Sequence, residues 1–231
     1  MYKKIIHHIV EEHFDHPQSG MIKAGMHQGM QHNDHYTNLA RAVESESAVK
    51  LRMDAHSFFN KYLWRLRNYL ISALGTGDDL ASVEGQLFQN INDLGELVAQ
   101  YYTSSAANSV NEHLSGYATA MTELIQGMKS GKSVQPFKDA ALAHANGLSM
   151  VLMPLNPTRW PAVAVKDIFS KYTDLWVAQV DARLKKNWAA DISALDQAHK
   201  LIVGDSGGTP GFADIFASGI IQQFPERFNR T

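Results

Sequence analysis

The residues best suited to chemistry in this sequence are histidines that crowd near its beginning. Seven of the 11 histidines fall within the first 35 residues. On a helix, His8, Glu12 and His16 recur every four residues and share one face. Two imidazoles and a carboxylate on one face are a ligand set that zinc and other divalent metals accept. These three residues are therefore a candidate metal site.

A second candidate site follows, where histidines alternate with methionines. His27, His32 and His35 lie among three methionines, Met21, Met26 and Met30. Thioethers and imidazoles together suit copper. Histidine and methionine in an arm also pack against partner subunits, and the lack of a compact ligand spacing favours that second interpretation. We therefore expect no cofactor, with zinc or copper as the alternative.

Motifs for other chemistries are missing or incomplete in the sequence. The chain has no cysteine, which excludes disulfides and thiolate sites. It has no Gly-x-Ser-x-Gly elbow, and the glycines of residues 204–208 lack the ending of a phosphate loop. Asp196 and His199 are the nearest approach to a di-iron ligand pair, and a core histidine bonded to a neighbouring helix explains His199 more simply. No catalytic residue is predicted.

The composition of the chain limits which partners and which cellular compartment can be expected. The formal net charge of −2 leaves no basic surface to predict nucleic-acid or anionic-membrane binding. No apolar run approaches the roughly 20 residues of a membrane span. Residues 1–10 lack the continuous apolar core and cleavage site of a signal peptide. We expect a soluble protein in the cytoplasm or within an assembled particle.

The elements that position these residues are long amphipathic helices. The clearest pattern runs through residues 161–204 without a helix breaker, and it predicts one helix of roughly 60 Å. Its apolar face is expected to include Trp188 and Ile192, and its water-facing side Lys186 and Asp191. Apolar periodicity predicts further helices at residues 3–15, 36–74, 80–98, 106–128, 136–151 and 212–224.

Short connections between long helices favour antiparallel neighbours, so the predicted fold is an all-α, up-and-down helical bundle. Residues 18–33 are rich in Gly, Gln, Met and His without a clear period, which marks a boundary. We therefore divide the chain into a His/Met-rich extension or arm, residues 1–50, and a helical bundle domain, residues 51–231.

Several short stretches of the bundle domain recur together in one known family. They are residues 67–72 (RNYLIS), 90–95 (NINDLG), 101–102 (YY), 156–157 (NP) with 160–161 (WP), 183–184 (RL) with Trp188 and 190–192 (ADI), and 219–225 (GIIQQFP). The last string is the most specific. Through them, residues 51–228 resemble a family of small bacterial all-helical proteins of unknown function, sometimes labelled glycosyltransferase or acetylglutamate kinase.

The resemblance implies an interior polar site that has lost its ligands in this chain. Where the family carries histidines and glutamates, the matching positions here are Tyr62, Tyr117, Tyr172 and Gln179, and a family glutamate beside Asp93 is Asn92. Phenols and amides do not replace imidazoles and carboxylates as ordinary metal ligands. The resemblance thus implies a degenerate site at these residues together with His199.

Two functions from different classes follow from these patterns. The first is a non-enzymatic structural or assembly protein, whose N-terminal arm docks on a protein partner or on another copy in a larger particle such as a virion. The alternative is a helical bundle that binds a metal or a small ligand, through the N-terminal histidines or through the polar interior. An enzymatic activity is the weaker third hypothesis.

Overall fold

A computed structural model describes residues 45–205 and 208–228 of the chain. This part contains eight α-helices and no strand, which confirms the predicted all-α class. No helix in the described part is both long and apolar enough to cross a membrane. The predicted helices at residues 3–15 and 36–44 lie outside the described residues.

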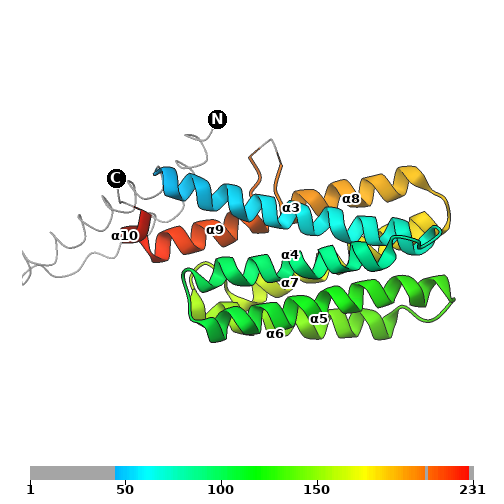
Figure 1. The fold of residues 1–231 in the computed structure, drawn as a ribbon, viewed down its shortest axis with the longest axis horizontal. Helices are drawn as coiled ribbons and strands as arrows, with labels where there is room; N and C mark the ends of the chain where they lie inside the picture. The colour runs from blue at the N-terminus through cyan, green and yellow to red at the C-terminus, as the bar shows by residue number, and fades with distance from the viewer. Residues whose placement is uncertain (1–44, 206–207, 229–231) are drawn as a thin grey trace, which may run out of the picture.

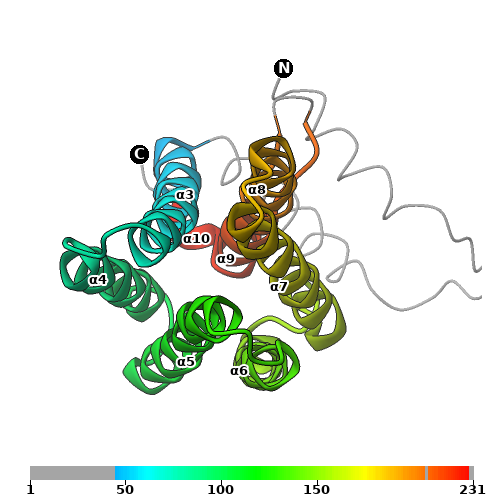
Figure 2. The same cartoon turned by 90° about the vertical axis from the view of Figure 1, so that its right-hand side faces the viewer.

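Helices α3 to α8 alternate in direction along the chain, as expected for an up-and-down bundle, whereas α9 continues in the direction of α8 (Figure 1). In chain order they are α3 (Glu46–Leu74), α4 (Leu80–Ala99), α5 (Ser104–Lys129), α6 (Gln135–Leu155), α7 (Ala162–Leu184), α8 (Trp188–Ile202), α9 (Phe212–Gln223) and α10 (Pro225–Phe228). Seen end-on, α3 to α8 surround a common axis, and α9 and α10 lie between α3 and α7 (Figure 2). Buried apolar side chains from all of these elements fill the centre as one core.

Helix α3 joins the core earlier than the sequence pattern indicates. Its N-cap Ser45 accepts a hydrogen bond from the amide of Ala48 at 3.2 Å. The negative charge of Glu46 in the first turn interacts favourably with the helix dipole. Ala48 is fully buried and Leu51 is 2% exposed. Helix α3 therefore contributes to the core on both sides of the expected boundary between residues 50 and 51.

The single helix predicted for residues 161–204 is wrong, because the chain reverses direction at Lys186. This residue has a φ of 57°, in the left-handed region that breaks a helix. Asn187 then caps α8, its side-chain oxygen accepting from the amide of Ala190 at 3.2 Å. Residues 162–202 thus form a hairpin of two helices, α7 and α8, and only α7 keeps the predicted direction.

Helix α9 fills one end of the bundle with aromatic rings. Phe212 lies 5.2 Å from Phe59 of α3 and 5.3 Å from Phe169 of α7, measured between ring centroids. Phe216 stacks on Trp160, and the Trp160 indole N–H donates to the carbonyl of Ile215 at 3.2 Å. The C-terminal helix thereby ties α3 to the corner between α6 and α7.

Candidate functional site

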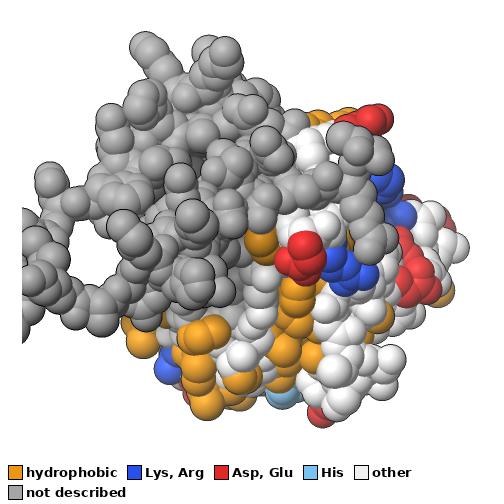
Figure 3. Space-filling model, turned by 90° about the vertical axis from the view of Figure 1, so that its left-hand side faces the viewer, with side chains coloured by type: hydrophobic (Ala, Val, Ile, Leu, Met, Phe, Trp, Pro, Cys, Tyr) orange, Lys and Arg blue, Asp and Glu red, His pale blue; other side chains and the backbone are white. Residues whose placement is uncertain are grey.

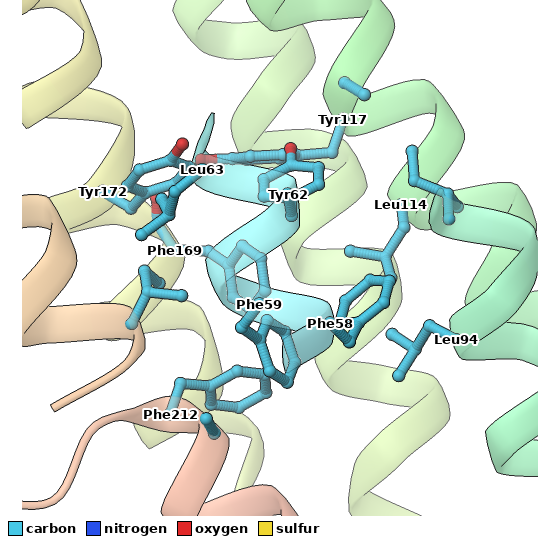
Figure 4. Close-up of a cluster of buried hydrophobic side chains, with 14 of the residues drawn as sticks. Phe58, Phe59, Tyr62, Leu63, Leu94, Leu114, Tyr117, Phe169, Tyr172 and Phe212 are labelled. Atoms are coloured by element: carbon cyan, nitrogen blue, oxygen red, sulfur yellow. The ribbon is translucent and has the colours of Figure 1, made fainter. Parts of the chain in front are cut away.

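The structure brings together three of the tyrosines that the resemblance placed in the interior site. Tyr62 of α3, Tyr117 of α5 and Tyr172 of α7 converge at the centre of the bundle (Figure 4). The ring centroids of Tyr62 and Tyr172 are 6.4 Å apart, and those of Tyr117 and Tyr172 are 6.3 Å apart. All three side chains are buried. We call them the tyrosine cluster.

Of the three hydroxyls in the tyrosine cluster, that of Tyr117 is held by hydrogen bonds within the protein. The Tyr117 hydroxyl donates to the carbonyl of Phe169 at 3.1 Å and lies 2.8 Å from the Thr173 hydroxyl. The Tyr62 hydroxyl is buried and has no hydrogen-bond partner among the described residues. Burial raises the pKa of all three phenols, so they stay neutral and do not act as bases at ordinary pH.

The interior around these rings is filled with side chains. A cavity of about 10 Å³ lies between the tyrosine cluster and α9, lined among others by Phe59, Leu114 and Phe169. Such a space holds one water at most. A small ligand in the bundle interior, one form of the alternative hypothesis, would need the packed rings to move.

The remaining residues of the predicted site do not join the tyrosine cluster. Asn92 and Asp93 are exposed on α4, and Asp93 accepts a hydrogen bond from Gln89 at 3.0 Å. His199 is half-buried on α8. Gln179 is buried on α7, two turns beyond Tyr172, and its side-chain oxygen faces Arg67 at 3.4 Å. The expected interior site therefore divides into a tyrosine cluster and a separate polar cluster around Gln179.

The candidate metal ligands of the extension, His8, Glu12, His16, His27, His32 and His35, lie outside the described residues. Among the residues that are described, no group of three or more potential metal ligands comes together. The nearest pair of imidazoles is His113 on α5 and His144 on α6, with ring centroids 6.1 Å apart. Zinc or copper binding by the extension stays a prediction.

The second cluster is a buried network of charges that joins α3, α7 and α8. The Arg67 guanidinium donates to both oxygens of Asp191, at 2.7 and 2.8 Å. Arg183 donates to the Asp191 Oδ2 oxygen at 2.6 Å. Asp191 is 1% exposed and Arg67 is 8% exposed. We call Arg67, Gln179, Arg183 and Asp191 the ion cluster.

The electrostatics of the ion cluster keep Asp191 ionised. Burial alone would raise the pKa of this carboxyl, but hydrogen bonds and charge from Arg67 and Arg183 outweigh burial and lower it. Paired in this way, the carboxylate has its acceptor sites occupied by two arginines. Its position at the junction of three helices makes a structural role the simplest interpretation, because removing either partner leaves a buried charge unpaired.

Sequence analysis placed Asp191 on the water-facing side of α8 and Trp188 and Ile192 on its buried side, and the structure shows the reverse. Trp188 and Ile192 are each 53% exposed, whereas Asp191 is buried. The error follows from taking the large apolar residues as the buried face of α8, because that face is formed by Asp191, Ala194, Ala198 and Ile202. Arg67, Arg183 and Asp191 belonged to the stretches that carry the family resemblance, and this was the signal that could have singled them out.

Exposed apolar side chains lie on α3 and α8 beside the residues of the ion cluster. Trp64 and Ile71 lie one turn before and after Arg67 on α3, and they are 50% and 42% exposed. On α8, Trp188 and Ile192 flank Asp191, and the Arg183 guanidinium lies 5.5 Å from the centroid of the Trp188 ring. We call these four residues, Trp64, Ile71, Trp188 and Ile192, the apolar strip. Helices α3 and α8 lie side by side in both views, so the strip spans two elements (Figures 1 and 2).

The comparisons with known proteins give no family for this chain: no family model matches it, and searches of curated proteins and of solved structures returned no significant match. The resemblance to a family of small bacterial helical proteins therefore stays a prediction.

Proposed function

We propose that this chain is a non-enzymatic structural or assembly protein. Its helical bundle is a rigid block, and its N-terminal extension joins that block to a protein partner or to another copy within a larger particle such as a virion. The observation that carries the proposal is the apolar strip, which leaves two tryptophans half-exposed beside a buried ion cluster. Tryptophan and arginine are enriched at the energetic centres of protein interfaces.

The packing of the interior supports the same proposal. The Tyr117 hydroxyl and the charged groups of the ion cluster are bonded within the fold, and the cavity of about 10 Å³ leaves little space for a ligand in the core. A larger pocket of about 320 Å³ lies at the turn between α3 and α4, lined by Ile71 and Asp79 among others. The ion cluster fixes α8 to α3 and α7, which holds the two halves of the apolar strip in one relative position. A rigid, preformed surface binds with a smaller loss of conformational entropy than a mobile one.

Native mass spectrometry and light scattering of the full-length chain test the proposal over a range of protein concentrations. We expect assemblies larger than one chain, which weaken when Trp64 and Trp188 are both replaced by serine. Val163→Ser is the matched control, because Val163 is 82% exposed at the start of α7 and lies outside the strip. Figure 3 shows other hydrophobic side chains at the end of the bundle opposite the view of Figure 2. A full-length chain that stays monomeric at every concentration, alone and with its native cell extract, contradicts the proposal.

The competing hypothesis of metal binding makes a separate prediction. Elemental analysis of protein purified without a histidine tag would find zinc or copper at a fixed ratio to the chain, and His8→Ala with His16→Ala would lower that ratio. Protein that contains no metal and is unchanged by added zinc or copper removes this hypothesis.

A further inference from the structure

The apolar strip continues along α3 towards the point where the described chain begins. Met53 and Val49 are 67% and 47% exposed, and helical spacing places them on the same side of α3 as Trp64 and Ile71. The exposed side of α3 thus carries large apolar residues near both of its ends, and Ser57, Asn60 and Lys61 separate the two groups. The group that includes Trp64 and Ile71 is the part of α3 that belongs to the apolar strip.

The extension contains one segment with the matching pattern. Residues 3–15 carry five apolar residues on one side of the predicted helix, namely Ile5, Ile6, Ile9, Val10 and Phe14. We infer that this segment, residues 3–15 of the chain, docks on the apolar strip. The inference rests on the proposed function, in which the extension acts by docking, and it names the surface that receives the extension.

The length of the connecting chain fits this placement. Residues 16–35 separate the segment from the helix predicted at residues 36–74, which begins about 14 Å before Ser45, and 20 residues can extend over at most about 66 Å. Along α3, the rise from Ser45 is about 29 Å to Trp64 and about 39 Å to Ile71. The same connection therefore reaches the strip of its own chain and the strip of a neighbouring copy.

The charges of the two surfaces give the segment a direction. Its second half contains Glu11, Glu12 and Asp15, and its beginning contains Lys3 and Lys4. The end of the strip near Trp188 carries the exposed Lys186 next to Lys185, which pairs with Asp181 at 2.9 Å, and the exposed Asp196 lies two turns further along α8. Opposite charges pair when the acidic half of the segment lies beside Trp188 and its lysines lie towards Asp196.

Disulfide trapping tests the inference in the full-length protein, because the chain has no cysteine of its own. The first variant combines Glu12→Cys with Ala189→Cys, an exposed position that follows Trp188 in α8. The matched control combines Glu12→Cys with Ala143→Cys, an exposed position on α6. Both are oxidised mildly and analysed on non-reducing gels, after circular dichroism has verified that each variant keeps its helix content.

We expect the Ala189→Cys variant to form its disulfide at least about tenfold faster than the control, since docking raises the effective concentration of the two thiols. Adding Ile9→Asp, which places a charge on the apolar side of the segment, should remove the difference. A bond within one chain and a bond between two chains both support docking on the strip. Equal rates for the two cysteine positions overturn it.

The experiments distinguish failure of this inference from failure of the proposed function. If full-length protein assembles but the two cysteine positions react equally, the extension docks elsewhere and the assembly proposal stands. If the disulfide at Ala189→Cys forms rapidly within a chain that is always monomeric, the docking surface is correct and the assembly proposal fails.

Discussion

His144 of α6 lies directly over Gly116 of α5, so close that a Cβ atom added to this glycine would fall 2.1 Å from the Cε1 atom of the ring. The arrangement is reciprocal, because His113 of α5 lies over Gly147 of α6, where an added Cβ would fall 2.3 Å from its ring. Each helix thus supplies a histidine and, three residues later, a glycine that makes room for the other histidine. The ring centroids of His113 and His144 are 6.1 Å apart.

The first prediction concerns these glycines. Gly116→Ala should lower the free energy of unfolding by about 1–3 kcal/mol, because the added methyl group overpacks the contact with His144. Gly85→Ala is the control, since nothing lies within 4 Å of a Cβ added at Gly85 on the exposed side of α4. That change should stabilise the protein by about 0.5–1 kcal/mol through helix propensity alone. Urea unfolding measures both, and equal effects would contradict the close packing.

The second prediction concerns the ion cluster. Asp191→Asn leaves Arg67 and Arg183 without their buried counter-charge, so we expect a loss of about 3–5 kcal/mol in the free energy of unfolding. Asp174→Asn is the matched control, because Asp174 pairs with Lys138 at 2.6 Å but is 62% exposed. Exposed pairs contribute about 0–1 kcal/mol. Chemical unfolding compares the two, and a similar loss in both variants would show that the buried network adds nothing special.

The third prediction is the pH dependence of the same network. The pKa of Asp191 is lowered in the folded protein, so its contribution is complete above the unfolded pKa of about 4 and is lost as the pH falls through the folded value. Unfolding of the wild type and of Asp191→Asn should therefore be measured between neutral pH and strongly acidic pH. The difference in stability between the two proteins should shrink on the acidic side. A difference that is constant with pH would speak against a paired carboxylate.

The fourth prediction concerns His56, which links α3 to the start of α9. Its Nε2 atom lies 2.8 Å from the Asp214 Oδ1 oxygen, and this hydrogen bond raises the pKa of His56 despite partial burial. The contribution to stability is therefore present below the unfolded pKa of about 6.5 and is lost as the pH rises through the folded value. Nuclear magnetic resonance titration should show His56 titrating above an exposed histidine, and Asp214→Asn should bring it down. An unchanged His56 titration in that variant would rule out the pair.

The fifth prediction separates two members of the tyrosine cluster. Tyr62→Phe removes a buried hydroxyl that has no partner among the described residues, so stability should be unchanged or rise slightly. Tyr117→Phe removes a hydroxyl bonded to Phe169 and Thr173 and should cost about 0.5–3 kcal/mol. Thermal unfolding compares the pair. A large loss from Tyr62→Phe would mean that its hydroxyl has a partner that the described residues do not include.

Local periodicity was enough to predict helices at the positions of α4, α5, α6 and α9, although α6 continues through Pro154 to Leu155, beyond the predicted end at residue 151. It failed at Lys186, where a lysine adopts the left-handed conformation without any sequence signal for a break. Because the turn at Lys186 was not predicted, the ion cluster was not predicted either. Its residues Arg67 and Asp191 are brought together from helices that are distant in the chain. The structure brings Tyr62, Tyr117 and Tyr172 together in the core and leaves Asn92 and Asp93 exposed on α4. A shift of one residue along a helix rotates a position by about 100° and can move it from the core to the surface.

The pairing of Arg67 with Asp191 joins residues that are 124 positions apart in the chain. Neighbouring helices such as α5 and α6, or α7 and α8, form hairpins. Their contacts are local in sequence and therefore form quickly during folding. The bond between α3 and α8 closes a long loop, whose entropic cost has to be met before its contacts are gained. We therefore expect the helical hairpins to form first. The contact between α3 and α8, which includes the salt bridge between Arg67 and Asp191, should form last.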